Sequence, residues 1–110
     1  MRLSIKLTIE NEKAFFGPGT YTLLKYVEEK GSLLTAAESM GLSYSKARKM
    51  IKNYKEQTGH DAIISQAGGI GGGSAKITEH AKIFMNKYDI LLDRTQELIQ
   101  KNFKELYEEA

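Results

Sequence analysis

The segment from Gly31 to Lys52 constrains the fold most, because its spacing predicts two short helices joined by a tight turn. Four apolar residues fall at i, i+3, i+4 and i+7 and form one buried stripe: Leu33, Ala36, Ala37 and Met40. Gly41 suits the left-handed residue that ends this helix, and Ser43 is a favourable N-cap for the next one. The two small alanines let the helices cross closely, so the segment predicts a helix-turn-helix.

The second helix of this motif, predicted over residues 43–58, has a strongly basic face. Its predicted buried side consists of Tyr44, Ala47, Ile51 and Tyr54. The range holds five basic side chains and one acidic one, although the whole chain has a net charge of only +2. Local concentration of positive charge is what attracts phosphates. A lysine-rich helix face is also common on ordinary protein surfaces. On the second helix of a helix-turn-helix, however, such a face favours DNA binding.

The elements before the motif are predicted from alternation and from turn residues. Apolar side chains alternate with polar ones over residues 3–10, which predicts a strand with one buried face. Gly17-Pro18-Gly19 is a turn signal, and the next helix is predicted from about 20 to 30.

A hairpin is predicted after the motif, with strands at 61–65 and 75–77. The connection, residues 66–74, contains five of the ten glycines of the chain. The spacing of Gly68 and Gly73 matches a phosphate loop, but Ser74 stands where such a loop requires lysine, and a strand follows instead of a helix. The pattern therefore favours a wing that meets the DNA backbone or the minor groove.

A long helix is predicted from Thr78, its N-cap, to about Tyr107, a length of roughly 45 Å at 1.5 Å per residue. Its apolar stripe is longer than one small winged domain can cover, which predicts pairing with a second copy. The predicted dimerisation residues are Phe84, Tyr88, Leu91, Leu92, Leu98, Ile99, Phe103 and Leu106. The predicted fold is mainly α with a small β-hairpin: a winged helix-turn-helix domain over 1–77, followed by a dimerisation helix over 78–110.

The sequence resembles one family over about residues 3–92. The matching motifs are Phe16-Gly-Pro-Gly19, Gly31-Ser32, Ala36-Ala37, Gly41-Leu-Ser-Tyr44 and the wing Gly68-Gly-Ile-Gly-Gly-Gly-Ser-Ala-Lys-Ile-Thr78. They are similar to the N-terminal DNA-binding domain of ModE-type molybdate-responsive regulators and, more distantly, to LysR-type regulators. The resemblance implies a prokaryotic winged-helix homodimer on an operator of two-fold character. Arg48 departs from the family's usual tryptophan, and Ala81 from its usual glycine. The family's molybdate domains follow the long helix, whereas this chain stops at Ala110, so we expect a stand-alone regulator that binds no molybdate and no other cofactor.

The predicted DNA-binding residues are Ser43, Tyr44, Ser45, Lys46, Arg48, Lys49, Lys52, Lys55, Gly71, Gly72 and Lys76. The side chains predicted to contact base edges are Ser45, Arg48, Lys49 and Lys52. Phosphates are assigned to Ser43, Lys46, Lys55, Lys76 and backbone amides. Tyr44 is expected mainly to pack, with its hydroxyl reaching a phosphate.

Other functional classes find little support. The chain has no cysteine and only two histidines, which excludes a thiolate metal site and leaves no catalytic triad, so we expect neither an enzyme nor a metal protein. The absence of a long apolar run favours a cytoplasmic, nucleoid-associated protein that contacts no membrane. The partners expected are double-stranded DNA and a second copy, with effector sensing by a separate protein left open. The alternative is a winged-helix adaptor that binds a protein and no DNA.

Overall fold

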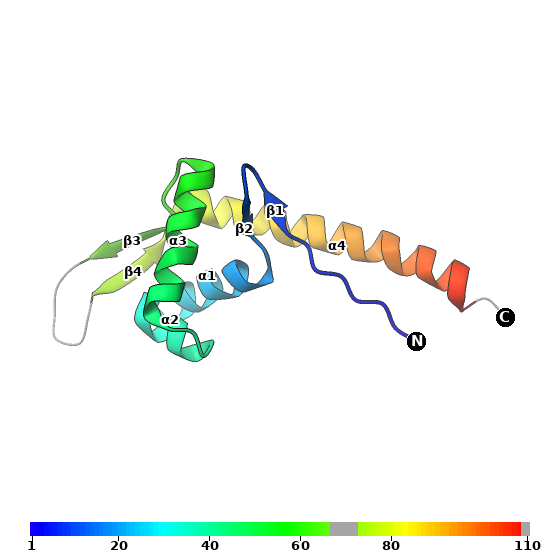
Figure 1. Cartoon of the computed structure of the whole chain (residues 1–110), viewed down its shortest axis with the longest axis horizontal. Helices are drawn as coiled ribbons and strands as arrows, with labels where there is room; N and C mark the ends of the chain where they lie inside the picture. Colours follow the sequence, from blue (N-terminus) through cyan, green and yellow to red (C-terminus); the bar gives the residue numbers. More distant parts are fainter. Residues whose placement is uncertain (67–72, 109–110) are drawn as a thin grey trace.

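The computed structural model describes residues 1–66 and 73–108, and it has the predicted fold class. Its elements in chain order are β1 (Ile9–Glu10), β2 (Ala14–Phe16), α1 (Pro18–Lys30), α2 (Leu33–Ser39), α3 (Tyr44–Thr58), β3 (Ile63–Gln66), β4 (Ser74–Ile77) and α4 (Glu79–Tyr107). The short helices and both antiparallel hairpins gather at one end, and α4 projects from them (Figure 1), so the molecule measures 62 × 27 × 21 Å. The mainly helical winged fold with a long final helix is confirmed.

The helix ends of the helix-turn-helix follow from local capping, as predicted. The Ser43 hydroxyl accepts a hydrogen bond from the Lys46 amide at 3.1 Å at the start of α3, and the Ser32 hydroxyl caps α2 in the same way. Gly41 has φ of 68°, a left-handed conformation that costs an L side chain energy. Ala36 and Ala37 are fully buried, so α2 and α3 cross closely.

An aromatic cluster forms the centre of the core and includes the beginning of α4. Phe16 is 1% exposed, and its ring lies 4.7 Å from that of Phe84 and 4.9 Å from that of Tyr88. The α3 residue Tyr54 completes the cluster and is fully buried. The first turns of α4 therefore pack inside the winged domain, and the predicted division after residue 77 stays a prediction.

The N-terminal segment differs from its prediction. Only Ile9–Glu10 pairs with β2, because the partner strand has just three residues before Gly17 and Pro18 end it. The preceding residues run along α4 (Figure 1), with Leu3, Ile5 and Leu7 half-buried and the Tyr88 hydroxyl donating to the Leu7 carbonyl at 2.8 Å. Alternation therefore predicted the buried face correctly, but the predicted strand over residues 3–10 was wrong for most of its length.

The two histidines, isolated in sequence, come together in the fold. The rings of His60 and His80 stack with centroids 4.0 Å apart. The Tyr54 hydroxyl and His80 Nδ1 share a hydrogen bond of 2.6 Å, and burial raises the pKa of Tyr54 to about 12. Burial, with smaller contributions from His60 and Lys87, lowers the pKa of His80 below its usual 6.5.

The lowered pKa of His80 predicts that the folded protein loses stability in weak acid. Unfolded His80 takes up a proton near pH 6.5, and folded His80 does so only at lower pH. The unfolded state then binds more protons, so the free energy of unfolding falls as the pH falls below about 6.5. Urea unfolding at several pH values between roughly 7.5 and 5.5 measures this slope.

Two variants separate the causes of this pH dependence. We expect His80→Gln to remove the slope, whereas His60→Gln should only reduce it, because it eliminates the smaller repulsive contribution and leaves burial in place. An unchanged slope in His80→Gln would contradict the assignment.

Candidate nucleic-acid interface

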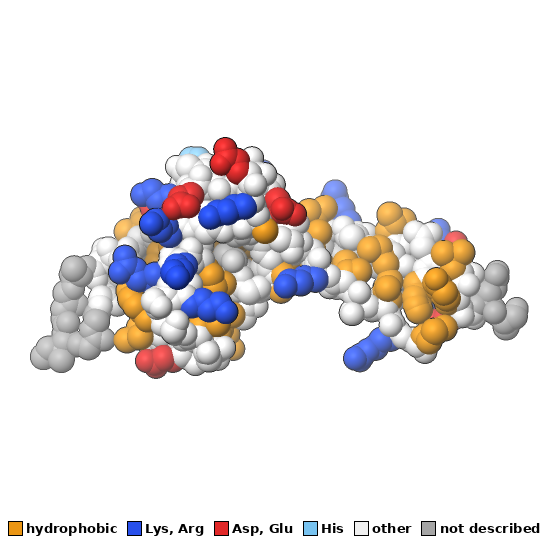
Figure 2. All heavy atoms as spheres, viewed as in Figure 1, with side chains coloured by type: hydrophobic (Ala, Val, Ile, Leu, Met, Phe, Trp, Pro, Cys, Tyr) orange, Lys and Arg blue, Asp and Glu red, His pale blue; other side chains and the backbone are white. Residues whose placement is uncertain are grey.

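Helix α3 divides into a buried side and a basic exposed side. Ala47 and Tyr54 are fully buried and Ile51 is half-buried. All residues of the predicted DNA-reading set on this helix and at its N-cap are exposed: Ser43, Tyr44, Ser45, Lys46, Arg48, Lys49, Lys52 and Lys55. Figure 2 shows Lys and Arg side chains gathered over α3.

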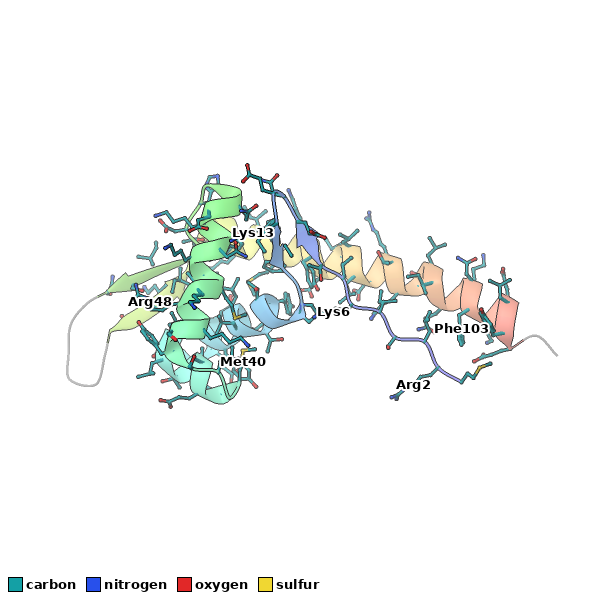
Figure 3. All side chains as sticks on the ribbon, in the orientation of Figure 1. Arg2, Lys6, Lys13, Met40, Arg48 and Phe103 are labelled. Carbon is teal, nitrogen blue, oxygen red and sulfur yellow. The ribbon has the colours of Figure 1, made fainter. Side chains whose placement is uncertain are left out.

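One groove lies between α3 and β3. It has a volume of about 660 Å³, and Arg48, Lys52, Lys55 and Asp61 lie on its walls. The Arg48 guanidinium lies 5.9 Å from the centre of the Tyr44 ring, within cation–π range. Arg48 (Figure 3) is therefore held on an exposed aromatic surface, while its N–H groups stay open to a ligand.

Tyr44 corrects the prediction that it belongs to the buried stripe. Its side chain is 45% exposed. Tyr44 is the first residue of α3, so it lies outside the place where α2 and α3 cross. It borders both the groove beside β3 and a second groove that reaches β4. This exposure leaves the ring and hydroxyl accessible to a ligand.

Two ion pairs modulate the charge of the basic side. Lys55 Nζ lies 3.1 Å from an Asp61 carboxylate oxygen, and Lys52 Nζ lies 3.9 Å from Glu56. All four side chains are about half exposed or more, where an ion pair stabilises by roughly 0–1 kcal/mol. A phosphate can therefore replace either carboxylate at small cost. Sequence reasoning missed Asp61 because the Gly59 turn brings it back beside Lys55.

The β3–β4 hairpin, called the wing below, is fixed against the helices. Its register pairs Ile63 with Ile77 and Gln66 with Ser74. The Ala75 amide donates to the Gly31 carbonyl at 2.8 Å, which ties β4 to the end of α1. Lys76 is exposed, as a phosphate contact requires. The predicted contacts Gly71 and Gly72 lie outside the described residues.

The apolar stripe of α4 is only partly open. Tyr88 is 3% exposed, and Phe84 and Leu92 pack against the same core, which corrects the expectation that the whole stripe faces a partner. Beyond Tyr88, five large apolar side chains stay exposed: Ile90 at 42%, Leu91 at 45%, Leu98 at 63%, Leu106 at 76% and Tyr107 at 66%. Ile99 and Phe103 are half-buried and border a groove of about 690 Å³ beside Leu3.

Other kinds of site find no support in the described part of the chain. Its residues bring no three metal-ligating side chains together. None of its helices is both long enough and apolar enough to cross a membrane.

Comparison with known proteins connects this interface to transcription regulators. No family model matches the chain. The chain is 32% identical over 92 residues to the DNA-binding transcriptional dual regulator ModE of Escherichia coli K12, and 33% identical over 94 residues to ModE of Haemophilus influenzae. These matches cover 83% and 84% of this chain but 35% and 36% of the relatives, so the chain spans about a third of their length.

A solved structure supports the fold independently. ArgP from Mycobacterium tuberculosis, a LysR-type regulator, aligns with 76% of this chain and 30% of its own, with a TM-score of 0.51 and 19% identity. None of the relatives and structures named here is described as an enzyme. Over most of its length the chain is thus similar in sequence to ModE regulators, and it shares the fold of the aligned part of ArgP.

Proposed function

We propose that this chain binds DNA sequence-specifically and regulates transcription as a homodimer, with α3 in the major groove. The observation that carries the proposal is the exposed basic side of α3, whose five cations lie on a helix capped at both ends and flanked by the wing. A rigid cationic helix of this kind fits the major groove of B-DNA. The names of the ModE relatives support the same function. Such a protein acts on the nucleoid in the cytoplasm.

The proposed contacts divide into base reading and backbone binding. Ser45, Arg48, Lys49 and Lys52 face base edges, because they lie opposite the buried stripe of α3. Ser43, Lys46, Lys55 and Lys76 contact phosphates from the ends of α3 and from the wing, together with the Tyr44 hydroxyl and the amides of Gly71 and Gly72. Phosphate contacts orient the protein, and base contacts supply the sequence preference.

The proposed homodimer forms through the exposed C-terminal half of α4. Figure 2 shows hydrophobic side chains clustered toward that end. Leu98 and Leu106 lie in the same half of α4 and are exposed. A contiguous apolar patch on a long projecting helix marks an interaction surface. Pairing two copies there presents two α3 helices to two half-sites.

The direct test is binding to a random duplex at low salt, followed by selection of bound sites from genomic DNA. A DNA-binding protein should show affinity that falls steeply as salt rises. A winged-helix adaptor for another protein should show no salt-dependent binding to the duplex, and that result would overturn the proposal.

Arg48 and Lys55 should separate specificity from affinity. Replacing Arg48 with alanine should weaken the free energy of binding by roughly 1–3 kcal/mol on the selected operator and by little on random DNA. The reason is that a guanidinium can donate two parallel hydrogen bonds to guanine. Replacing Lys55 should weaken both DNAs about equally and lower the salt slope by about one per protomer. Fluorescence anisotropy on both duplexes across several salt concentrations measures these effects.

The Lys55 variant needs a control for Asp61, because the two side chains form an ion pair. Lys55→Ala leaves that carboxylate beside the proposed DNA path, so part of its effect is added repulsion. The double variant with Asp61→Asn removes the repulsion and isolates the phosphate contact. Equal weakening of both DNAs by Arg48→Ala would show that the proposed orientation of α3 is wrong.

A further inference from the structure

The turn between β1 and β2 is fastened to the second half of α3. The Gln57 side-chain oxygen accepts from the amides of Glu12 at 2.9 Å and Lys13 at 3.2 Å, and the Asn11 side chain donates to the Gln57 carbonyl at 2.9 Å. The Asn53 side chain donates to the Ala14 carbonyl at 2.8 Å. These bonds hold the β1–β2 hairpin, and with it the base of the Lys13 side chain, at a set place beside α3.

The hairpin brings a further lysine to a groove that is already basic. Lys13 borders a groove of about 460 Å³ together with Lys46, Lys49 and Lys52, and Glu56 is the acidic residue on its walls. Within the described residues, Lys13, Lys46 and Lys49 have no carboxylate within ion-pair distance. This groove reaches Lys13 in the β1–β2 turn, whereas the groove of Arg48 reaches Ile63 and Ser65 in β3. The two grooves share Lys49 and Lys52, so they lie on either side of these two residues of α3.

The positive charge continues from this groove along the N-terminal segment. Lys6 borders an adjoining groove that shares Met50 and Asn53 with that of Lys13. Figure 3 shows Lys13, Lys6 and Arg2 following one another along this segment. The residues facing solvent there are Arg2, Ser4, Lys6 and Thr8, because Leu3, Ile5 and Leu7 turn toward α4. We define the hairpin edge as Lys6, Lys13 and Lys46.

We propose that the hairpin edge binds the phosphate backbone of the DNA, on the side of α3 away from the wing. This inference rests on the proposed function. A helix in the major groove has a sugar-phosphate strand on each side of it, because the groove is about 12 Å wide. The wing faces one strand, and the hairpin edge faces the other and continues onto flanking base pairs. The contact is independent of sequence, since lysine meets phosphate there and no base edge.

The experiment measures salt-dependent binding by three full-length variants. Lys13→Gln should lower the salt slope by about 0.9 per protomer and weaken operator and random duplex alike, roughly fivefold per protomer at 0.15 M salt. Lys6→Gln should act similarly on a long duplex, and its effect should disappear on a duplex trimmed of flanking base pairs. Gln57→Leu keeps the charge of Lys13 but releases the hairpin turn, so it should reproduce part of the loss.

The matched control is Lys25→Gln, an exposed lysine on α1 outside the proposed DNA and dimer contacts, which should leave the salt slope unchanged. Thermal unfolding of each variant checks that the fold is intact. If the unaltered protein shows the steep salt dependence but Lys13→Gln and Lys6→Gln share its slope, the hairpin edge is refuted and the proposed function stands. If the unaltered protein shows no salt dependence, both proposals are overturned.

Discussion

Replacing Leu98 and Leu106 with aspartate is expected to turn a dimer into a monomer and to weaken operator binding by about 10²–10⁴-fold. These side chains are 63% and 76% exposed, and pairing of α4 would bury them, where an unpaired carboxylate is costly. The loss in affinity is large because a linked second half-site binds at a high effective concentration, which a monomer lacks. Equilibrium sedimentation gives the mass, and anisotropy gives the affinity.

Ile83→Asp is the matched control for this double variant. Ile83 is 50% exposed on the same helix, but it lies near the N-terminal end of α4 beside the winged domain, so we expect the dimer to persist. Truncating the chain before Tyr88 is a poorer test, because it also removes a core ring that donates a hydrogen bond to Leu7. A Leu98/Leu106 variant that sediments as a dimer would refute the proposed interface.

Replacing Phe16 with alanine is expected to lower the free energy of unfolding by about 3–5 kcal/mol. The ring is 1% exposed and contacts rings from α1, α3 and α4, so its loss leaves a cavity where these helices meet β2. Urea unfolding followed by circular dichroism measures the change. DNA binding should weaken in parallel, because the same cluster holds α3 against α4.

Phe103→Ala is the control, because it removes the same side chain from a half-buried position near the end of α4. Phe103→Ala should lower the free energy of unfolding clearly less than Phe16→Ala does, under conditions in which the chain is monomeric. Equal losses in the two variants would contradict the placement of the core around Phe16.

The elements set by local contacts could be predicted from the sequence. Serine or threonine caps begin α2, α3 and α4, and glycines with positive φ end α1 and α3, so the helix limits needed only neighbouring residues. The β3–β4 hairpin could also be predicted, because its two strands are close together along the chain. The candidate site was predictable to the extent that it lies on one helix, since the period of α3 separates Ala47 and Tyr54 from the exposed cations.

The features that depend on distant residues were missed or mistaken. Alternation over residues 3–10 indicated a buried face, but whether a strand or α4 covers that face depends on the length of β2. The periodicity of α4 predicts one continuous interface, although the first half of the stripe is covered by Phe16 and its neighbours. Periodicity identifies an apolar face and cannot say which surface meets it.

By itself, the sequence determined the order and limits of the helices, the basic side of α3 and the resemblance to ModE-type regulators. The tertiary structure decided which charges and rings meet: Lys55 with Asp61, His60 with His80, and Lys13 with the groove of α3. Capping and helical period act over three or four residues, so they can be read along the chain. Contacts between elements depend on how those elements pack in three dimensions, which no local pattern records.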